Sequence, residues 1–244
     1  MPHELVALRT PDGECPTHVM TPEGAGPWPA AMMYMDAGGI RPGMLAMAQR
    51  LADAGYVVLL PDLFYRYGPY APFVPKEVFA GDFRAVLGPL MATTDNGKAA
   101  LDTRALLDYL DTRGDVAGRH VGAVGFCMGG GMAIAAAAAY PDRFAAVASF
   151  HGGNLATDAP TSPHLGAKRL RAEVYIAAAE NDRSYPADMA ERLEAALTEA
   201  GVSFRGETYP AAHGWMMPDF PVYDHEAAER GWTELTALFQ RTLR

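Results

Sequence analysis

The amino-acid sequence predicts an α/β fold, in which a mostly parallel β-sheet is covered by helices on both faces. Short, continuous apolar runs recur along the chain, as expected of strands that are buried on both faces. Between them lie longer segments whose apolar residues recur at helical spacing, and strands that alternate with helices form parallel sheets. The 244 residues contain no break in composition and no Ser/Gly linker, so we expect a single domain over residues 1–244.

The predicted strands are short and lie between turn-forming residues. The first two form a small β-unit, because the Pro-Asp-Gly sequence at residues 11–13 makes a turn between them. The third, an uncharged run at residues 30–35, lies between Pro29 and the Asp-Ala-Gly-Gly sequence at 36–39, as is typical of a buried strand. We expect strands over residues 5–10, 17–21, 30–35, 56–60, 121–125, 145–150, 173–178 and 204–209.

Gly and Pro mark where the predicted helices end. A helical pattern begins at Pro42 and stops at Gly55. An alanine-rich helix stops at Pro141, and Gly201 follows the helix after it. An irregular, aromatic-rich stretch occupies residues 62–75. We expect helices over residues 42–54, 78–91, 99–110, 128–140, 187–200 and 226–243.

Composition narrows the function classes. Twenty Lys and Arg against 29 Asp and Glu give a net charge of −9, which argues against a nucleic-acid partner. No run approaches a membrane span or a signal peptide, and two cysteines are too few for a disulfide framework, so we expect a cytoplasmic protein without a membrane partner. No group of His, Cys, Asp and Glu has zinc-like spacing, and we expect neither a metal nor another cofactor. The sequence is compatible with a monomer and with a homodimer.

The sequence Gly-Phe-Cys-Met-Gly at residues 125–129 joins a predicted strand to a predicted helix. It matches the Gly-x-Ser-x-Gly nucleophile elbow, with Cys127 at the serine position. A thiol at a helix N-terminus is favoured as thiolate, and the backbone N–H of Met128 is available to an oxyanion. The alternative is a small buried cysteine at a glycine-rich helix entry. The glycines around Cys127 match neither the Gly-x-Gly-x-x-Gly motif of dinucleotide-binding proteins nor the Gly-Lys-Ser/Thr motif of phosphate-binding loops.

A thiol nucleophile needs a base, and the base needs a third group that sets its tautomer. In α/β-hydrolases the chain order is nucleophile, acid, histidine. The strand at 173–178 runs into Glu-Asn-Asp, where Asp182 is the predicted acid and Glu180 its rival. His213 lies in a loop after the last predicted strand and is the predicted base.

Further side chains are candidates for the wall of a substrate pocket. His151 follows a strand and could face the pocket, or it could be a histidine satisfied by backbone groups. Several aromatic residues would make an apolar wall suited to a cyclic or aromatic acyl group, although ordinary packing under a long loop explains them equally well. They are Tyr65, Tyr67, Tyr70, Phe73 and Trp215.

Taken together, these motifs resemble the dienelactone hydrolase family, a branch of the α/β-hydrolases with a cysteine nucleophile. The resemblance covers nearly the whole chain and is carried by Gly-Phe-Cys-Met-Gly-Gly, Glu-Asn-Asp, Ala-His-Gly-Trp and Met-Asp-Ala-Gly-Gly-Ile-Arg-Pro. It implies an α/β-hydrolase fold and hydrolysis of a small lactone or activated ester without a cofactor. It also implies that Cys127 is the nucleophile, His213 the base and Asp182 its orienter. The N–H groups of Met128 and Ala37 would form the oxyanion hole.

The chain departs from the family's best-known members at two positions. Asp36 stands where those members have a glutamate that influences the charge of the thiol. The side chain of Asp36 is one methylene shorter than that glutamate, and Asp36 could instead act as a turn residue before Gly38. No arginine follows His213 to bind a substrate carboxylate, which leaves Arg66 or Arg84 as candidates.

The resulting hypothesis is a hydrolase that forms a thioester with its substrate. A non-catalytic α/β-hydrolase-like binding protein that keeps the elbow for packing is the alternative from another class. A redox-sensing thiol ranks last, because Cys127 has no Cys-x-x-Cys partner and Cys15 lies in the N-terminal β-unit.

Overall fold

The computed structural model describes residues 2–243, and within them the strands form one eight-stranded sheet in the order β1-β2-β4-β3-β5-β6-β7-β8. Strands β3 to β8 run parallel to one another, whereas β2 pairs antiparallel with both β1 and β4. The predicted α/β class is therefore confirmed. The strands are β1 His3–Thr10, β2 Gly13–Met20, β3 Trp28–Tyr34, β4 Val57–Pro61, β5 Val116–Phe126, β6 Phe144–Phe150, β7 Glu173–Ala179 and β8 Phe204–Tyr209.

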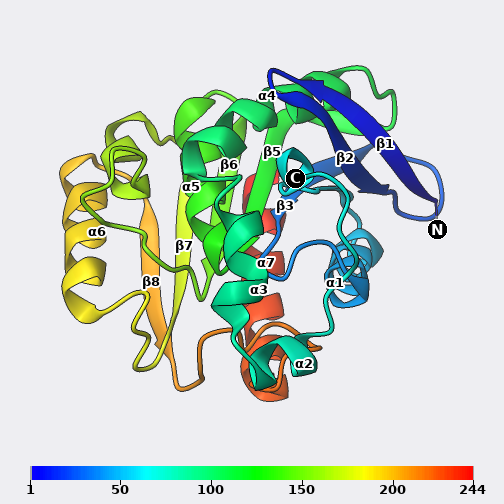
Figure 1. Ribbon diagram of the computed structural model, residues 1–244. Helices are drawn as coiled ribbons and strands as arrows, with labels where there is room; N and C mark the ends of the chain where they lie inside the picture. The colour runs from blue at the N-terminus through cyan, green and yellow to red at the C-terminus, as the bar shows by residue number, and fades with distance from the viewer. Residues whose placement is uncertain (1, 244) are drawn as a thin grey trace.

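Helices cover both faces of this sheet (Figure 1). Helices α4 and α5 pack together on one face, while α7 lies behind the central strands with α1 beside it. Strands β3, β4 and β6 are almost entirely buried between these layers, which explains their uninterrupted apolar sequences. The helices are α1 Pro42–Asp53, α2 Pro75–Ala80, α3 Phe83–Met91, α4 Asn96–Asp111, α5 Met128–Ala139, α6 Ala187–Glu199 and α7 His225–Leu243, with 3-10 turns η1 Tyr65–Tyr67 and η2 Pro163–Arg169. No helix within residues 2–243 has the length and apolar character needed to cross a membrane.

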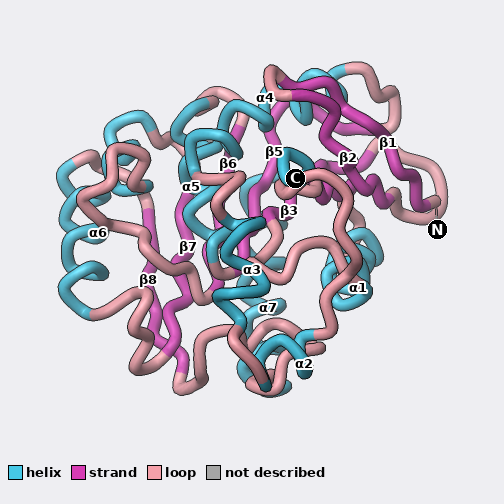
Figure 2. The backbone as a smooth tube through the Cα atoms, viewed as in Figure 1, coloured by secondary structure: helices cyan, strands magenta, loops and turns pink. Residues whose placement is uncertain are grey.

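The segment predicted as one helix over residues 78–91 is two helices. Helix α2 ends before Gly81, and the carboxylate of Asp82 caps α3 by accepting hydrogen bonds from the N–H groups of Arg84 and Ala85. Gly and Asp favour this interruption, because glycine weakens a helix interior and aspartate caps a new one. A loop over residues 68–74 leads from η1 to α2 (Figure 2).

Helix α5 passes unusually close to the sheet. A Cβ atom at Gly125 would lie 1.9 Å from the carbonyl oxygen of Gly129, and one at Gly129 would lie 2.3 Å from that of Tyr34. Glycine is therefore required at both positions, because the obstructing atoms belong to backbone that is fixed in β3 and α5. These contacts hold the turn between β5 and α5 against the centre of the sheet.

Gly125→Ala should destabilise the fold by about 3 kcal/mol, because its methyl group would overlap backbone on the neighbouring helix. Gly114→Ala is the matched control, since no atom lies within 4 Å of its added Cβ, and it should change stability by less than about 1 kcal/mol. Urea unfolding followed by circular dichroism measures both variants. Equal stabilities for the two variants would contradict the close approach.

Candidate active site

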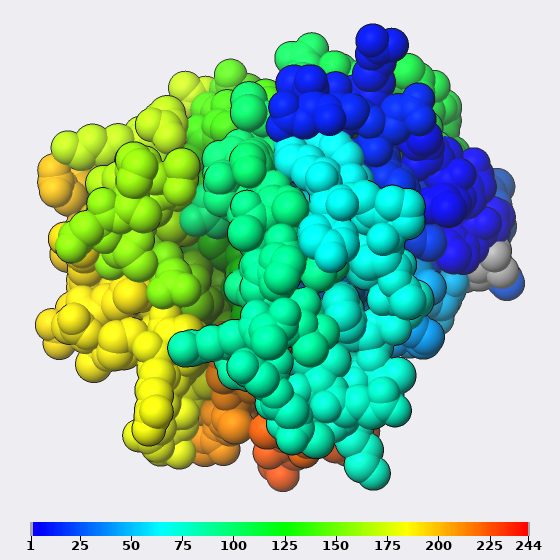
Figure 3. Space-filling model, in the orientation of Figure 1, coloured from blue at the N-terminus to red at the C-terminus, as the bar shows by residue number. Residues whose placement is uncertain are grey.

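A pocket of about 990 Å³ lies at the carboxyl ends of the parallel strands. It is lined by the loops that follow β3, β5, β6, β7 and β8, and by helices α2 and α3. In the space-filling view, a hollow separates the blue-green surface of α2 and α3 from the yellow-green and yellow surface after β6 and β7 (Figure 3). Ligand sites of α/β sheets form in this place, so the pocket is the candidate active site.

Cys127 occupies a strained turn at one wall of this pocket. Its φ of 54° and ψ of −118° lie in a region that L-residues rarely adopt. Two hydrogen bonds stabilise this strained conformation. The Cys127 N–H donates to the Phe150 carbonyl (3.1 Å), and the Gly130 N–H donates to the Cys127 carbonyl (3.1 Å). The side chain is half-buried and lines the pocket. Met128 is the first residue of α5, where backbone N–H groups have no acceptor within the helix.

His213 and Asp182 meet across the loops after β8 and β7. Nδ1 of His213 lies 2.6 Å from Oδ2 of Asp182. The other carboxylate oxygen accepts hydrogen bonds from the N–H (2.8 Å) and hydroxyl (2.6 Å) of Ser184, so the carboxylate is held from two sides. Burial raises the pKa of Asp182, but these hydrogen bonds and the charge of His213 outweigh burial and lower it. The side chain of the rival residue Glu180 is exposed and is not bonded to His213 among the described contacts.

His213 and Cys127 line the same pocket. Burial alone would lower the pKa of His213, but hydrogen bonds to Asp182 and Cys127, together with their negative charges, raise it to about 10. The imidazole is therefore protonated at neutral pH. A charged imidazole in contact with a cysteine favours the thiolate over the thiol.

His151 lies beneath Cys127, in the protein interior. Its Nδ1 accepts a hydrogen bond from the Cys127 N–H at 3.2 Å, and its side chain is fully buried. Burial, with the nearby charge of His213, holds the pKa of His151 well below its ordinary value. His151, predicted to contact substrate, instead supports the elbow from behind and is not among the residues that line the pocket.

Tyr65, Arg66 and Tyr70, predicted to contact substrate, also lie outside the pocket lining. The guanidinium of Arg66 binds both carboxylate oxygens of Asp102 at 2.9 and 2.7 Å, and the Tyr65 hydroxyl donates to the same carboxylate at 2.9 Å. The Tyr70 hydroxyl donates to Asp62 at 2.9 Å. These side chains hold the loop after β4 against neighbouring elements.

Trp215 was expected in the pocket wall, but it is fully buried. Its ring stacks on Tyr209 at a centroid distance of 4.9 Å and packs edge-on to His151 at 5.0 Å. Its sequence position next to His213 predicted a pocket contact, but the turn after that histidine directs the indole into the core. Trp215 therefore contributes to the layer behind the site.

Asp36 takes part in a buried ion pair. The Arg41 guanidinium donates to both Asp36 oxygens at 2.6 and 2.9 Å, and to Asp219 at 2.8 and 3.1 Å. Burial raises the pKa of Asp36, and the charge and hydrogen bonds of Arg41 oppose this. Asp36 also accepts from the Gly38 N–H at 2.8 Å, as the turn interpretation predicts, and lies beside the pocket with Ala37. Arg41 thus links the loop after β3 to the loop that follows His213.

Several lining residues were not identified from the sequence. Asn154 and Asn181 follow β6 and β7 with a φ of 56° each, and both line the pocket. Asparagine at a strand exit is the signal that could have found them, because it tolerates positive φ better than other non-glycine residues. Arg84, a sequence candidate, lines the pocket, as does Arg183, and neither forms an ion pair among the described contacts of residues 2–243. Within the same residues, no cluster of His, Cys, Asp and Glu is arranged to hold a metal ion.

Arg41→Met should destabilise the fold by about 3–5 kcal/mol, because it leaves the Asp36 carboxylate buried without its partner. Arg50→Met is the matched control: Arg50 pairs with Glu229, both side chains are 44% exposed, and the loss should be at most about 1 kcal/mol. Urea unfolding of both variants gives the comparison. Similar losses of stability in the two variants would show that the buried Asp36–Arg41 pair contributes no more than an exposed ion pair.

Asp182→Asn should change how stability depends on pH. Because the folded-state pKa of His213, about 10, lies above the ordinary 6.5, protonated His213 stabilises the fold fully below about pH 6.5. This contribution is lost as the pH rises through about 10. The difference in free energy of unfolding between wild type and variant should therefore shrink from pH 6.5 to pH 10.

Glu180→Gln provides the control for this pH dependence. It removes a carboxylate from the same loop that does not bond His213, so its difference from wild type should stay constant over the same pH range. Urea titrations at a series of pH values measure both differences. A difference for Asp182→Asn that stayed constant or grew toward pH 10 would contradict the pairing with His213.

Known proteins resemble this chain in both sequence and structure. A protein from Synechocystis sp. named "Putative carboxymethylenebutenolidase" is 26% identical over 246 residues, covering 98% of this chain and 97% of that protein. A crystal structure of a "Putative Dienelactone Hydrolase" from Klebsiella pneumoniae superposes with a TM-score of 0.85 at 23% identity, covering 98% of both chains. The dienelactone hydrolase from Anabaena variabilis gives a TM-score of 0.69 at 21% identity, covering 100% of this chain and 99% of that one.

The two solved structures share the fold with this chain. The family itself is established by the sequence, because the model of the dienelactone hydrolase family matches residues 15–243. That range includes the elbow and the loops that carry Asp182 and His213. The chain belongs to the dienelactone hydrolase family.

Proposed function

We propose that this protein hydrolyses small carboxylic esters or lactones through a thioester at Cys127, with His213 and Asp182 completing a catalytic triad. One observation carries the proposal: His213 lines the same pocket as Cys127, and its Nδ1 is bonded to the Asp182 carboxylate, which Ser184 holds in place. Nucleophile, base and orienter stand in this relation in other hydrolases. The curated relative named for carboxymethylenebutenolidase activity supports the same reaction class.

In the first half of the reaction, the Cys127 thiolate attacks the substrate carbonyl and the electron pair moves onto the oxygen. The N–H groups of Met128 and Ala37 would donate to this oxyanion, since both residues line the pocket beside the sulfur. The tetrahedral intermediate collapses by breaking the carbon–oxygen bond of the alcohol. The imidazolium of His213 gives its proton to the departing oxygen, unless that oxygen leaves as a stabilised enolate, and a thioester remains.

The second half needs His213 as a base, and acylation itself prepares it. The thiolate charge and hydrogen bond are two of the causes that raise the pKa of His213, and both disappear when the sulfur is acylated. The neutral imidazole then takes a proton from water, whose oxygen attacks the thioester. Collapse releases the carboxylic acid and restores the thiolate beside the imidazolium. Asp182 keeps Nδ1 protonated, so that Nε2 faces the reaction.

Cys127→Ala should lower kcat/KM for p-nitrophenyl acetate by at least about 1000-fold, because it removes the atom that forms the thioester. Cys15→Ala is the control: this cysteine is buried in the N-terminal hairpin and should leave turnover at the wild-type level. Circular dichroism confirms that both variants are folded. Unchanged turnover in Cys127→Ala would refute the proposed nucleophile.

Alkylation gives an independent measurement on the wild-type chain. Burial, with the charge of Asp102, raises the pKa of Cys15 to about 12, so that residue should not react with iodoacetamide at pH 7. Cys127 should be labelled, with loss of esterase activity at the same rate. Peptide mass spectrometry identifies the modified residue. Labelling of Cys127 without loss of activity would contradict a covalent mechanism.

A further inference from the structure

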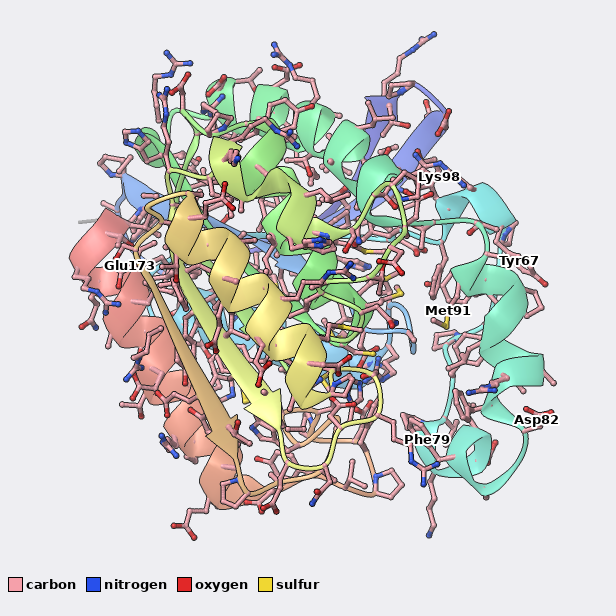
Figure 4. The ribbon with its side chains drawn as sticks, turned by 90° about the vertical axis from the view of Figure 1, so that its left-hand side faces the viewer. Tyr67, Phe79, Asp82, Met91, Lys98 and Glu173 are labelled. Atoms are coloured by element: carbon pink, nitrogen blue, oxygen red, sulfur yellow. The ribbon has the colours of Figure 1, made fainter. Side chains whose placement is uncertain are left out.

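Helices α2 and α3, here called the roof, cover the pocket from one side with apolar side chains. Phe79, Phe83 and Met91 all line the pocket from the roof. In the side-chain view, Phe79 and Met91 point from the roof toward the body of the molecule, whereas Asp82 points away from it (Figure 4). The roof is therefore amphipathic, with its apolar side over the cavity that also contains Cys127.

These apolar side chains have too few protein neighbours to cover them. Phe79 and Phe83 are each 43% exposed and Met91 is 38% exposed. The ring of Phe79 contacts Phe220 at a centroid distance of 4.8 Å and Phe83 at 6.3 Å, so the aromatic groups bound the hollow without filling it. Large apolar surface left open within a concave site is typical of a place where an apolar ligand binds.

The opposite wall extends the apolar surface toward the reacting sulfur. Met128 and Met132, one turn apart on α5, line the pocket next to Cys127. Methionine side chains adapt to ligands of different shape, because they are unbranched and polarisable. Polar lining residues such as Asn154 and Asn181 come from the loops after β6 and β7. The side formed by the roof and α5 is thus mostly apolar, with Arg84 as its charged group.

We infer that the substrates are esters or lactones bearing a bulky apolar group, of the size of an octanoyl or naphthyl group, which binds between the roof and α5. This inference rests on the proposed function of Cys127. The cavity volume, about 990 Å³, lies at the upper end of the 300–1,000 Å³ typical of sites for drug-sized ligands and far exceeds the need of an acetyl group. Beside Phe79, Phe83 and Met91, a polar group of the substrate would lose hydrogen bonds to water without replacement, which favours an apolar group there.

The expected signature is a rise in kcat/KM with chain length. Burial of one methylene contributes about 0.8 kcal/mol, which corresponds to about a fourfold rise in kcat/KM for each methylene that enters the apolar side. The p-nitrophenyl esters of acetate, butanoate and octanoate vary the acyl half. Ethyl and octyl acetate, followed by pH-stat titration, vary the alcohol half. A rise in either series supports the inference, and equal values within both series overturn it.

Roof variants test whether the preference comes from these residues. Phe83→Ser should lower the octanoate-to-acetate ratio of kcat/KM by at least tenfold, because it replaces an apolar wall with a hydroxyl. Val86→Ser is the matched control, since Val86 lies on the same helix, is 41% exposed and does not line the pocket; its ratio should equal that of wild type. Phe79→Ser, from the other roof helix, repeats the test should Phe83→Ser not fold.

The outcomes separate the two proposals. If Cys127→Ala is inactive on every ester but the wild-type ratio is flat, or Phe83→Ser and Val86→Ser give the same ratio, the roof inference is wrong and the proposed function stands. If Cys127→Ala retains wild-type turnover on all esters, the proposed function itself fails. A large wild-type ratio that falls only in the roof variants supports both.

Discussion

The close passage of α5 over β5 is the constraint on which the site depends. Because Gly125 and Gly129 have no side chains, the helix begins where any Cβ would overlap backbone, and the chain must turn sharply between them. Cys127 absorbs that turn with a φ of 54°. The same approach brings the first turn of α5 against the end of β3, so Met128 and Ala37 line one pocket although ninety residues separate them. The strained backbone conformation of this turn is therefore held by the packing of β3, β5 and α5.

The sequence predicted the fold and the residues that meet at the pocket because parallel strands impose an order. Their carboxyl ends lie along one edge, so residues that directly follow β5, β7 and β8 must come near one another whatever lies between them. Cys127, Asp182 and His213 each follow a strand in this way. Chain order does not distinguish Asp182 from its rival Glu180, because both follow β7; in the structure the hydrogen bond to His213 involves Asp182.

The pocket walls could not be predicted in the same way, because an aromatic residue in a loop carries no signal for the direction it faces. Tyr65 and Arg66 turn toward Asp102, a residue of α4 that no local pattern connects with them. Trp215 turns into the core behind the site. Conversely, Phe79 and Phe83 were included in a helical pattern and supply the pocket's apolar side. Local sequence determines that such residues are apolar, but long-range packing determines what they contact.

The two histidines of the site show how burial and pairing assign opposite charge states to the same residue type. Their ring centroids are 5.2 Å apart, so a positive charge on one disfavours a positive charge on the other. The hydrogen bond to Asp182 helps to raise the pKa of His213, which keeps its proton, whereas burial lowers the pKa of His151, which loses its proton. The neutral state of His151 is needed for the structure, because only an unprotonated Nδ1 is able to accept the hydrogen bond from the Cys127 N–H. The positive charge of His213 therefore also helps to keep His151 neutral and able to hold the strained turn.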